Sequence, residues 1–219
     1  MDGYVRIYGR VTDFNGSAIA NCNVEIKDAD MTQTDGNGGY EINVKKGNYT
    51  AIAAVKDYAV SQLEYWGWNA PAFDDIEINM RVDAIEVYAV NAFMIQRSRP
   101  FNSMMIYFRP MSLSRYKKLT DIDLNSSGVI NISPDLNENN ISVAIDGQTV
   151  NILTVNKVIE QGIDKPIKLY GYLVQTTLPE TESDGGYAKI HISLNDDVTG
   201  EKGEGSLFWK KPKAFELRA

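Results

Sequence analysis

The only histidine of the chain, His191, is the residue best suited to act as a general base. It lies between Ile190 and Ile192, so in a strand it would point away from the face on which those two residues pack, on the same side as Lys189 and Ser193. A hydrolytic triad would also need a nucleophile on a sharp turn, and no Gly-x-Ser-x-Gly pattern occurs. An enzyme would require a pocket that gathers His191 with carboxylates from both halves. The sequence therefore predicts that the protein is not an enzyme.

Two acidic loops have ligands of the kind that calcium prefers. In residues 34–39, Asp35 and Asn37 are two apart and a glycine follows, as at the front of a calcium-binding loop. The distal acidic ligand is missing, because Glu41 arrives too early and enters a strand. A second stretch could hold a cation weakly or form a solvated hairpin tip, and its acidic residues are Asp196, Asp197, Glu201 and Glu204. With no phosphate-binding loop or dinucleotide fingerprint either, the sequence predicts no metal site and no cofactor.

An aromatic segment is the first candidate for binding. Tyr65, Trp66 and Trp68 lie close together in a stretch that is expected to be a loop, and Phe73 follows. Such rings could stack on a sugar, anchor a protein interface, or plug the end of a sandwich or the seam between two domains. The sequence leaves these three interpretations open.

A basic segment is the second candidate for binding. The positive side chains of residues 97–118 form a local excess of charge in an acidic chain, and they could face an acidic neighbour or simply be solvated. These residues are Arg97, Arg99, Arg109, Arg115, Lys117 and Lys118.

Composition narrows the class of protein. The chain has 219 residues, 43% of them hydrophobic, with a formal net charge of −7, so it can form a proper core and is not expected to bind nucleic acid or anionic membranes. No apolar run approaches the roughly 18 residues of a transmembrane helix, and no signal peptide is recognised. The expected location is the cytoplasm or a larger particle. Cys22, the lone cysteine, is expected to face the core.

The first half reads as short strands. Alternation with a period of two covers residues 4–11, 22–27, 40–45 and 49–55, which is typical of half-buried strands. Glycine and asparagine close these segments, as in the Asn15-Gly16 turn. Short strands at near-regular spacing predict an all-β sandwich.

The order of these residues resembles the carboxypeptidase regulatory-like domain, a small transthyretin-like β-sandwich. The residues that carry the resemblance are Gly9-Arg10-Val11-Thr12-Asp13, Asn15-Gly16, Ile19, Cys22-Asn23-Val24-Glu25-Ile26, Thr34-Asp35, Gly38, Tyr40-Glu41-Ile42, Gly47, Tyr49 and Ile52. One departure is Ala18, where the family usually has proline. The resemblance covers about the first 82 residues and implies a spacer, a stabilising appendage or a binding platform.

The second half resembles no family and also reads as strands. Asp146-Gly147 indicates a tight hairpin, because a type I′ turn needs positive φ at both central residues. A short helical turn is expected over Leu113–Leu119, and residues 195–205 are expected to form a loop. The strands are expected over residues 85–92, 104–109, 129–132, 141–145, 149–153, 167–175, 187–194 and 206–209.

Together these patterns predict two all-β domains. Residues 1–82 would form the transthyretin-like sandwich, and residues 83–219 a second sandwich or small barrel. The favoured function is that of a non-enzymatic structural or protein-interaction protein within an assembly, with self-association or a protein partner at sheet edges and loops. The alternative is a ligand-binding module, for a carbohydrate at the aromatic segment or a small apolar molecule in the second domain.

Overall fold

The chain folds almost entirely into β-strands. This computed structural model describes residues 3–95, 102–120, 123, 128–162, 168–179 and 186–211. One short helix accompanies the strands, so the all-β prediction is confirmed. In the described part of the chain, no helix has the length and apolar character needed to span a membrane.

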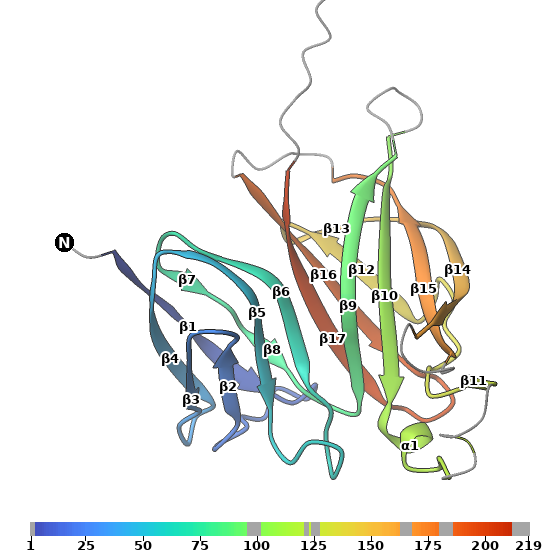
Figure 1. Cartoon of the computed structure of the whole chain (residues 1–219), viewed down its shortest axis with the longest axis horizontal. Helices are drawn as coiled ribbons and strands as arrows, with labels where there is room; N and C mark the ends of the chain where they lie inside the picture. The colour runs from blue at the N-terminus through green and yellow to red at the C-terminus, as the bar shows by residue number, and fades with distance from the viewer. Residues whose placement is uncertain are drawn as a thin grey trace, which may run out of the picture.

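The first half is a sandwich of two sheets (Figure 1). Its strands are β1 (Tyr4–Thr12), β2 (Asn23–Ile26), β3 (Asp30–Gln33), β4 (Gly39–Lys45), β5 (Gly47–Val55), β6 (Tyr65–Ala72), β7 (Ile76–Glu77) and β8 (Met80–Arg81). In one sheet β1 pairs with β4, β7 and β8, and in the other the order is β3-β2-β5-β6. Inward side chains of both sheets, such as Ile7, Val24 and Ile52, are fully or almost fully buried in one hydrophobic core.

The second half is also built from two facing layers of strands. Its elements are β9 (Ile85–Met94), β10 (Met104–Ser112), α1 (Leu113–Tyr116), β11 (Val129–Ile130), β12 (Ile141–Ile145), β13 (Gln148–Thr149), β14 (Ile152–Gln161), β15 (Lys168–Thr176), β16 (Tyr187–Asn195) and β17 (Lys202–Lys210). One layer has the order β11-β15-β10-β9, with β14 also paired to β15, and the other runs β13-β12-β16-β17. Phe108, Ile190 and Val174 are among the side chains that fill the space between the layers.

One hydrogen-bonded strand pair joins the two halves. β6 and β17 run parallel, with Trp66, Gly67 and Trp68 opposite Gly205, Ser206 and Leu207. As a result, strands from both halves form a single eight-stranded sheet with the order β13-β12-β16-β17-β6-β5-β2-β3 (Figure 1). The boundary between residues 82 and 83 stays a prediction, since the halves share this sheet.

The two hydrophobic cores lie on opposite faces of the shared sheet. Neighbouring residues of a strand point to opposite faces. On β17, Leu207 belongs to the core of the second half while Phe208 belongs to the core of the first. On β6, likewise, Tyr65 is buried in the first core and Trp68 packs against the second. The first core therefore covers one face of the sheet and the second core covers the opposite face, and the change occurs where β6 meets β17.

Two of the expected turns are confirmed, and two boundaries are wrong. Asp146 and Gly147 both have positive φ, as the hairpin prediction requires, and Gly16 also has positive φ. The strand expected over residues 149–153 is divided instead, because β13 ends at Thr149 and the chain crosses to the other layer as β14. The loop expected over residues 195–205 ends earlier, because β17 begins at Lys202.

Glycines let β17 pass close to β9. A Cβ at Gly203 would overlap the carbonyl oxygen of Ile85, and one at Gly205 would lie 2.8 Å from the carbonyl oxygen of Val87. The glycine-rich composition that suggested a loop thus reflects close backbone contact between two layers.

We expect Gly203→Ala to lower the free energy of unfolding by about 2 kcal/mol or more, because overpacking against backbone cannot be relieved by a rotamer change. The matched control is Gly36→Ala, whose added Cβ meets no atom within 4 Å. Urea unfolding of both variants measures the difference, and equal stabilities would contradict the close approach of β17 and β9.

Candidate functional site between the two halves

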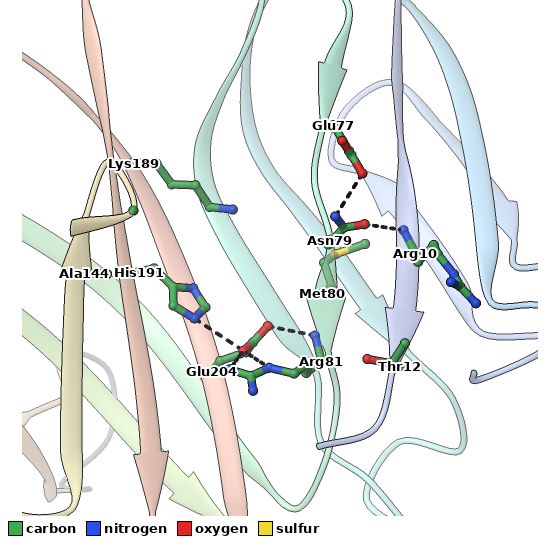
Figure 2. A pocket seen from close by; sticks show the side chains of 11 residues that line it. Arg10, Thr12, Glu77, Asn79, Met80, Arg81, Ala144, Lys189, His191 and Glu204 are labelled. Carbon is green, nitrogen blue, oxygen red and sulfur yellow. Dashed lines mark hydrogen bonds and ion pairs between the residues drawn. The ribbon is translucent and has the colours of Figure 1, made fainter. Parts of the chain in front are cut away.

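A cleft opens where the sheet changes its covered face. Its volume is about 520 Å³, and its walls come from β1, β7 and β8 on one side and from β12, β16 and β17 on the other (Figure 2). The lining residues are Arg10, Thr12, Glu77, Asn79, Met80, Arg81, Ala144, Gly147, Lys189, His191 and Glu204. His191 is therefore gathered with carboxylates from both halves, which is the arrangement that the sequence alone did not reveal.

Glu204 is the centre of this cleft's polar network. Its side chain is only 3% exposed. Its Oε2 accepts a hydrogen bond of 2.6 Å from Arg81 Nε, and the same oxygen lies 3.4 Å from His191 Nε2. Its Oε1 accepts the backbone N–H of Arg81 at 2.8 Å. Burial by itself would raise the pKa of this carboxyl, but His191 and Arg81 together hold the pKa below its usual range.

The network also places a serine beside the histidine, without making it a nucleophile. Ser206 Oγ lies 3.1 Å from His191 Nδ1, so serine, histidine and glutamate follow one another as in a hydrolytic triad. Ser206 is fully buried in the middle of β17, however, and its hydroxyl oxygen also accepts a hydrogen bond of 3.0 Å from Tyr65. A substrate cannot reach this hydroxyl in the structure, so the arrangement stabilises the seam.

The aromatic segment is a strand, which corrects the expectation of a loop. Tyr65 is buried, while Trp66 and Trp68 are half-buried neighbours on the other face of β6. The two indole rings stack at 5.0 Å between centroids, and Tyr88 of β9 packs edge-on against both. The alternation of Tyr65 and Gly67 with the two tryptophans was the signal for a strand. Of the three interpretations, these contacts favour rings that plug the seam between the halves.

A buried carboxylate accompanies this aromatic cluster. Glu86 is 6% exposed, and it accepts hydrogen bonds from Trp66 Nε1 at 3.0 Å and Tyr58 Oη at 3.4 Å. Burial, together with the charge of Glu64, raises the pKa of Glu86 to about 7 despite these donors. No signal in the sequence marked Glu86, since it is one acidic residue in an otherwise ordinary strand.

The other predicted binding residues are dispersed. Phe73 is 47% exposed and packs near Tyr187, with 6.4 Å between ring centroids. Arg109 lies 3.6 Å from Glu160 and over the ring of Tyr88.

Near α1, the remaining basic residues bind different partners. Arg115 forms an ion pair of 3.0 Å with Asp196, and the Lys117 ammonium donates to the carbonyl oxygen of Val60 at 2.5 Å. Lys118 is exposed beyond the end of α1. Arg97 and Arg99 lie outside the described residues. The structure therefore does not gather the described basic residues into one patch.

The acidic stretch after β16 is a hairpin tip that is solvated only in part, since residues 197–200, with Asp197 among them, are exposed. Asp196 is buried beside Arg115, and Glu201 accepts hydrogen bonds from Ser112 and Ser114. In the described part of the chain, no three His, Cys, Asp or Glu side chains are arranged to hold a metal ion. Cys22 is buried, as expected, and burial raises the pKa of its thiol to about 12.

Comparison with known proteins identifies only the first half. Residues 6–81 match the sequence model of the carboxypeptidase regulatory-like domain family, which confirms the resemblance over these residues. No curated protein matches the chain in sequence. Two structures of BcpA, the major pilin subunit of Bacillus cereus, show a weak likeness at 11% and 12% identity, covering 94% of this chain and 69% of the pilin chain. Their TM-score is 0.26 in both cases, which is too low to support any inference.

We expect Glu204→Gln to lower the free energy of unfolding at pH 7 by about 2 kcal/mol, because it removes a buried charge that Arg81 and His191 require. Since the pKa of Glu204 is lowered on folding, its contribution is present above the unfolded pKa near 4.5 and disappears as the pH falls through the folded value. Urea unfolding from pH 7 down to pH 3 should show the gap closing. The control is Glu41→Gln, which breaks an exposed pair with Arg6 and should change stability by less than about 0.5 kcal/mol.

Glu86→Gln should have the opposite pH dependence. Because the pKa of Glu86 is raised on folding to about 7, the stability it provides is full below the unfolded value of 4.5 and is lost as the pH rises through 7. The wild type should therefore lose up to about 3 kcal/mol between these limits through this group, and the variant should lose much less. Parallel pH profiles for the two proteins would show that folding does not raise the pKa of Glu86.

Proposed function

We propose that this chain is a non-enzymatic structural and interaction protein that works within an assembly, and that it associates with a second copy through β14. The observation that carries the proposal is the free edge of this strand. β14 has ten residues, and among the described residues it pairs only with β15 (Figure 1). A long strand with one unpaired edge offers a row of backbone donors and acceptors to another strand.

Side chains on β14 support the same role. Leu153 and Ile159 are 51% and 58% exposed, so this strand offers apolar side chains as well as a backbone edge to a partner. At the other end of the same sheet, β9 also has ten residues and pairs only with β10 among the described strands, but β17 passes close to it at Ile85 and Val87. The remaining sheet ends are less suited to pairing. β3 and β13 have four and two residues, and the exposed side chains of β4 include Glu41 and Lys45.

A second copy is a suitable partner because β14 can pair with itself. Antiparallel pairing about a two-fold axis at Val158 would place Lys157 opposite Ile159 and Asn156 opposite Glu160, so like charges are not opposed. Backbone pairing would then supply the hydrogen bonds, and the exposed apolar side chains would be covered. The match of residues 6–81 to the carboxypeptidase regulatory-like domain family is consistent with an assembly role, because that resemblance implies a spacer, an appendage or a platform.

We expect the molar mass from light scattering to rise above 24.4 kDa as the concentration of the purified chain increases. Ile159→Lys, which adds a charge to the edge without touching the core, should keep the monomer mass at the same concentrations. The matched control is Val198→Lys, since Val198 is 82% exposed and lies in the turn between β16 and β17.

Two results would refute this proposal. One is a constant monomer mass up to about 1 mM, where even weak specific association becomes visible. The other is equal loss of association in both lysine variants, because the effect would then come from net charge and not from β14.

A further inference from the structure

The cleft between the halves contains an ammonium group without a counterion. Lys189 extends from β16 into the cleft (Figure 2), and within the described residues its Nζ has no hydrogen-bond or ion-pair partner. Its nearest recorded contact is the ring of Phe208, whose centroid lies 5.9 Å away. Burial lowers the pKa of Lys189, opposed by the charge of Glu204, so the charged form lacks a partner that would offset its lost hydration.

The other charged groups of the cleft already have partners. Arg81 and His191 bind Glu204, as described above, so the carboxylate does not neutralise Lys189 as well. The guanidinium of Arg10 donates to the carbonyl oxygen of Asn37, at 2.8 Å from Nη2. Lys189 on β16 is therefore the charged group of the cleft with which a ligand could form an ion pair.

The opposite wall of the cleft carries an amide and a carboxylate. Asn79 donates to Glu77 Oε1 at 3.0 Å, and both side chains are exposed to the cleft (Figure 2). Met80 on one wall and Ala144 on the other add apolar atoms to the lining of the cleft. Apart from His191, the cleft is lined by three cationic side chains, Arg10, Arg81 and Lys189, and two carboxylates, Glu77 and Glu204. One negative charge on a ligand balances this excess, and a second would not be compensated.

We propose that this cleft binds a small monocarboxylate whose carboxylate contacts Lys189 and whose hydroxyl groups contact Glu77 and Asn79. The class that fits is a hydroxylated acid such as a sugar acid. A bound carboxylate would replace the water around the ammonium with a charge-assisted hydrogen bond. Because the walls belong to different halves, the ligand would also hold the halves together. This site is independent of β14 and goes beyond the proposed assembly role.

The test is a titration followed by amide chemical shifts of the full chain, with glucuronate and acetate as probes. Both should cause saturable shifts at Lys189, His191 and Asn79, and glucose, which lacks the carboxylate, should not. Lys189→Gln should weaken binding about tenfold or more, as expected for losing a charge-assisted hydrogen bond. Lys189→Arg keeps the charge and should retain binding, and the control Lys45→Gln removes an exposed lysine outside the cleft and should bind as the wild type does.

Each alternative outcome overturns the proposal. If neither glucuronate nor acetate causes saturable shifts, the cleft does not bind this class of ligand. Equal affinity for sulfate, which is a dianion at pH 7, contradicts the preference for a single charge. Equal affinity in Lys189→Gln, with the fold confirmed by its unchanged amide spectrum elsewhere, removes Lys189 from the site. By contrast, binding of glucuronate by a chain that stays monomeric would support this proposal while the assembly proposal fails.

Discussion

The parallel pairing of β6 with β17 is the constraint on which the rest of the structure depends. It fuses a layer from each half into one sheet, but the two cores cover opposite faces of that sheet. On each face of the shared sheet, the second layer of strands covers only one half and ends at the junction of β6 and β17. We call this end of the covering layer a step. On one face the step is the open cleft around Glu204, and on the other it is filled by Trp66, Trp68 and Tyr88. Both features follow from where two strands pair.

The two steps show how environment decides the state of a buried carboxyl. Glu204 and Glu86 lie at similar depth, yet their pKa values move in opposite directions on folding. Arg81 and His191 face Glu204, so the charged form is favoured despite burial. The hydrogen-bond donors to Glu86 are neutral, Trp66 and Tyr58 among them, and Glu64 adds a like charge. Burial therefore favours the neutral form up to about pH 7.

Local pattern was enough to predict the strands and turns of this chain, and too little to predict the site. Alternation and glycine turns are properties of neighbouring residues, which is why the hairpin at Asp146 and the position of His191 could be anticipated. The sequence predicts a loop at Glu204 because glycine is typical of turns, whereas its neighbours Gly203 and Gly205 accommodate the close approach of β9. Arg81 and Glu204 are 123 positions apart, and no periodicity links them. The partners of Arg109, Arg115 and Lys117 are likewise remote in sequence, so no local pattern could indicate them.

The fusion of the two sheets also determines which edges remain. Pairing β6 with β17 removes two edges that separate sandwiches would expose, and the ends of the joint sheet are the short strands β3 and β13. In the other layer of the second half, β17 crosses close to β9, which covers one end and leaves β14 at the other. Among the described strands of that layer, β14 is thus the end that no crossing strand covers, while the Lys189 ammonium lies in the cleft between the halves. An assembly contact and a ligand site can coexist here because the same pairing places them on different parts of the molecule.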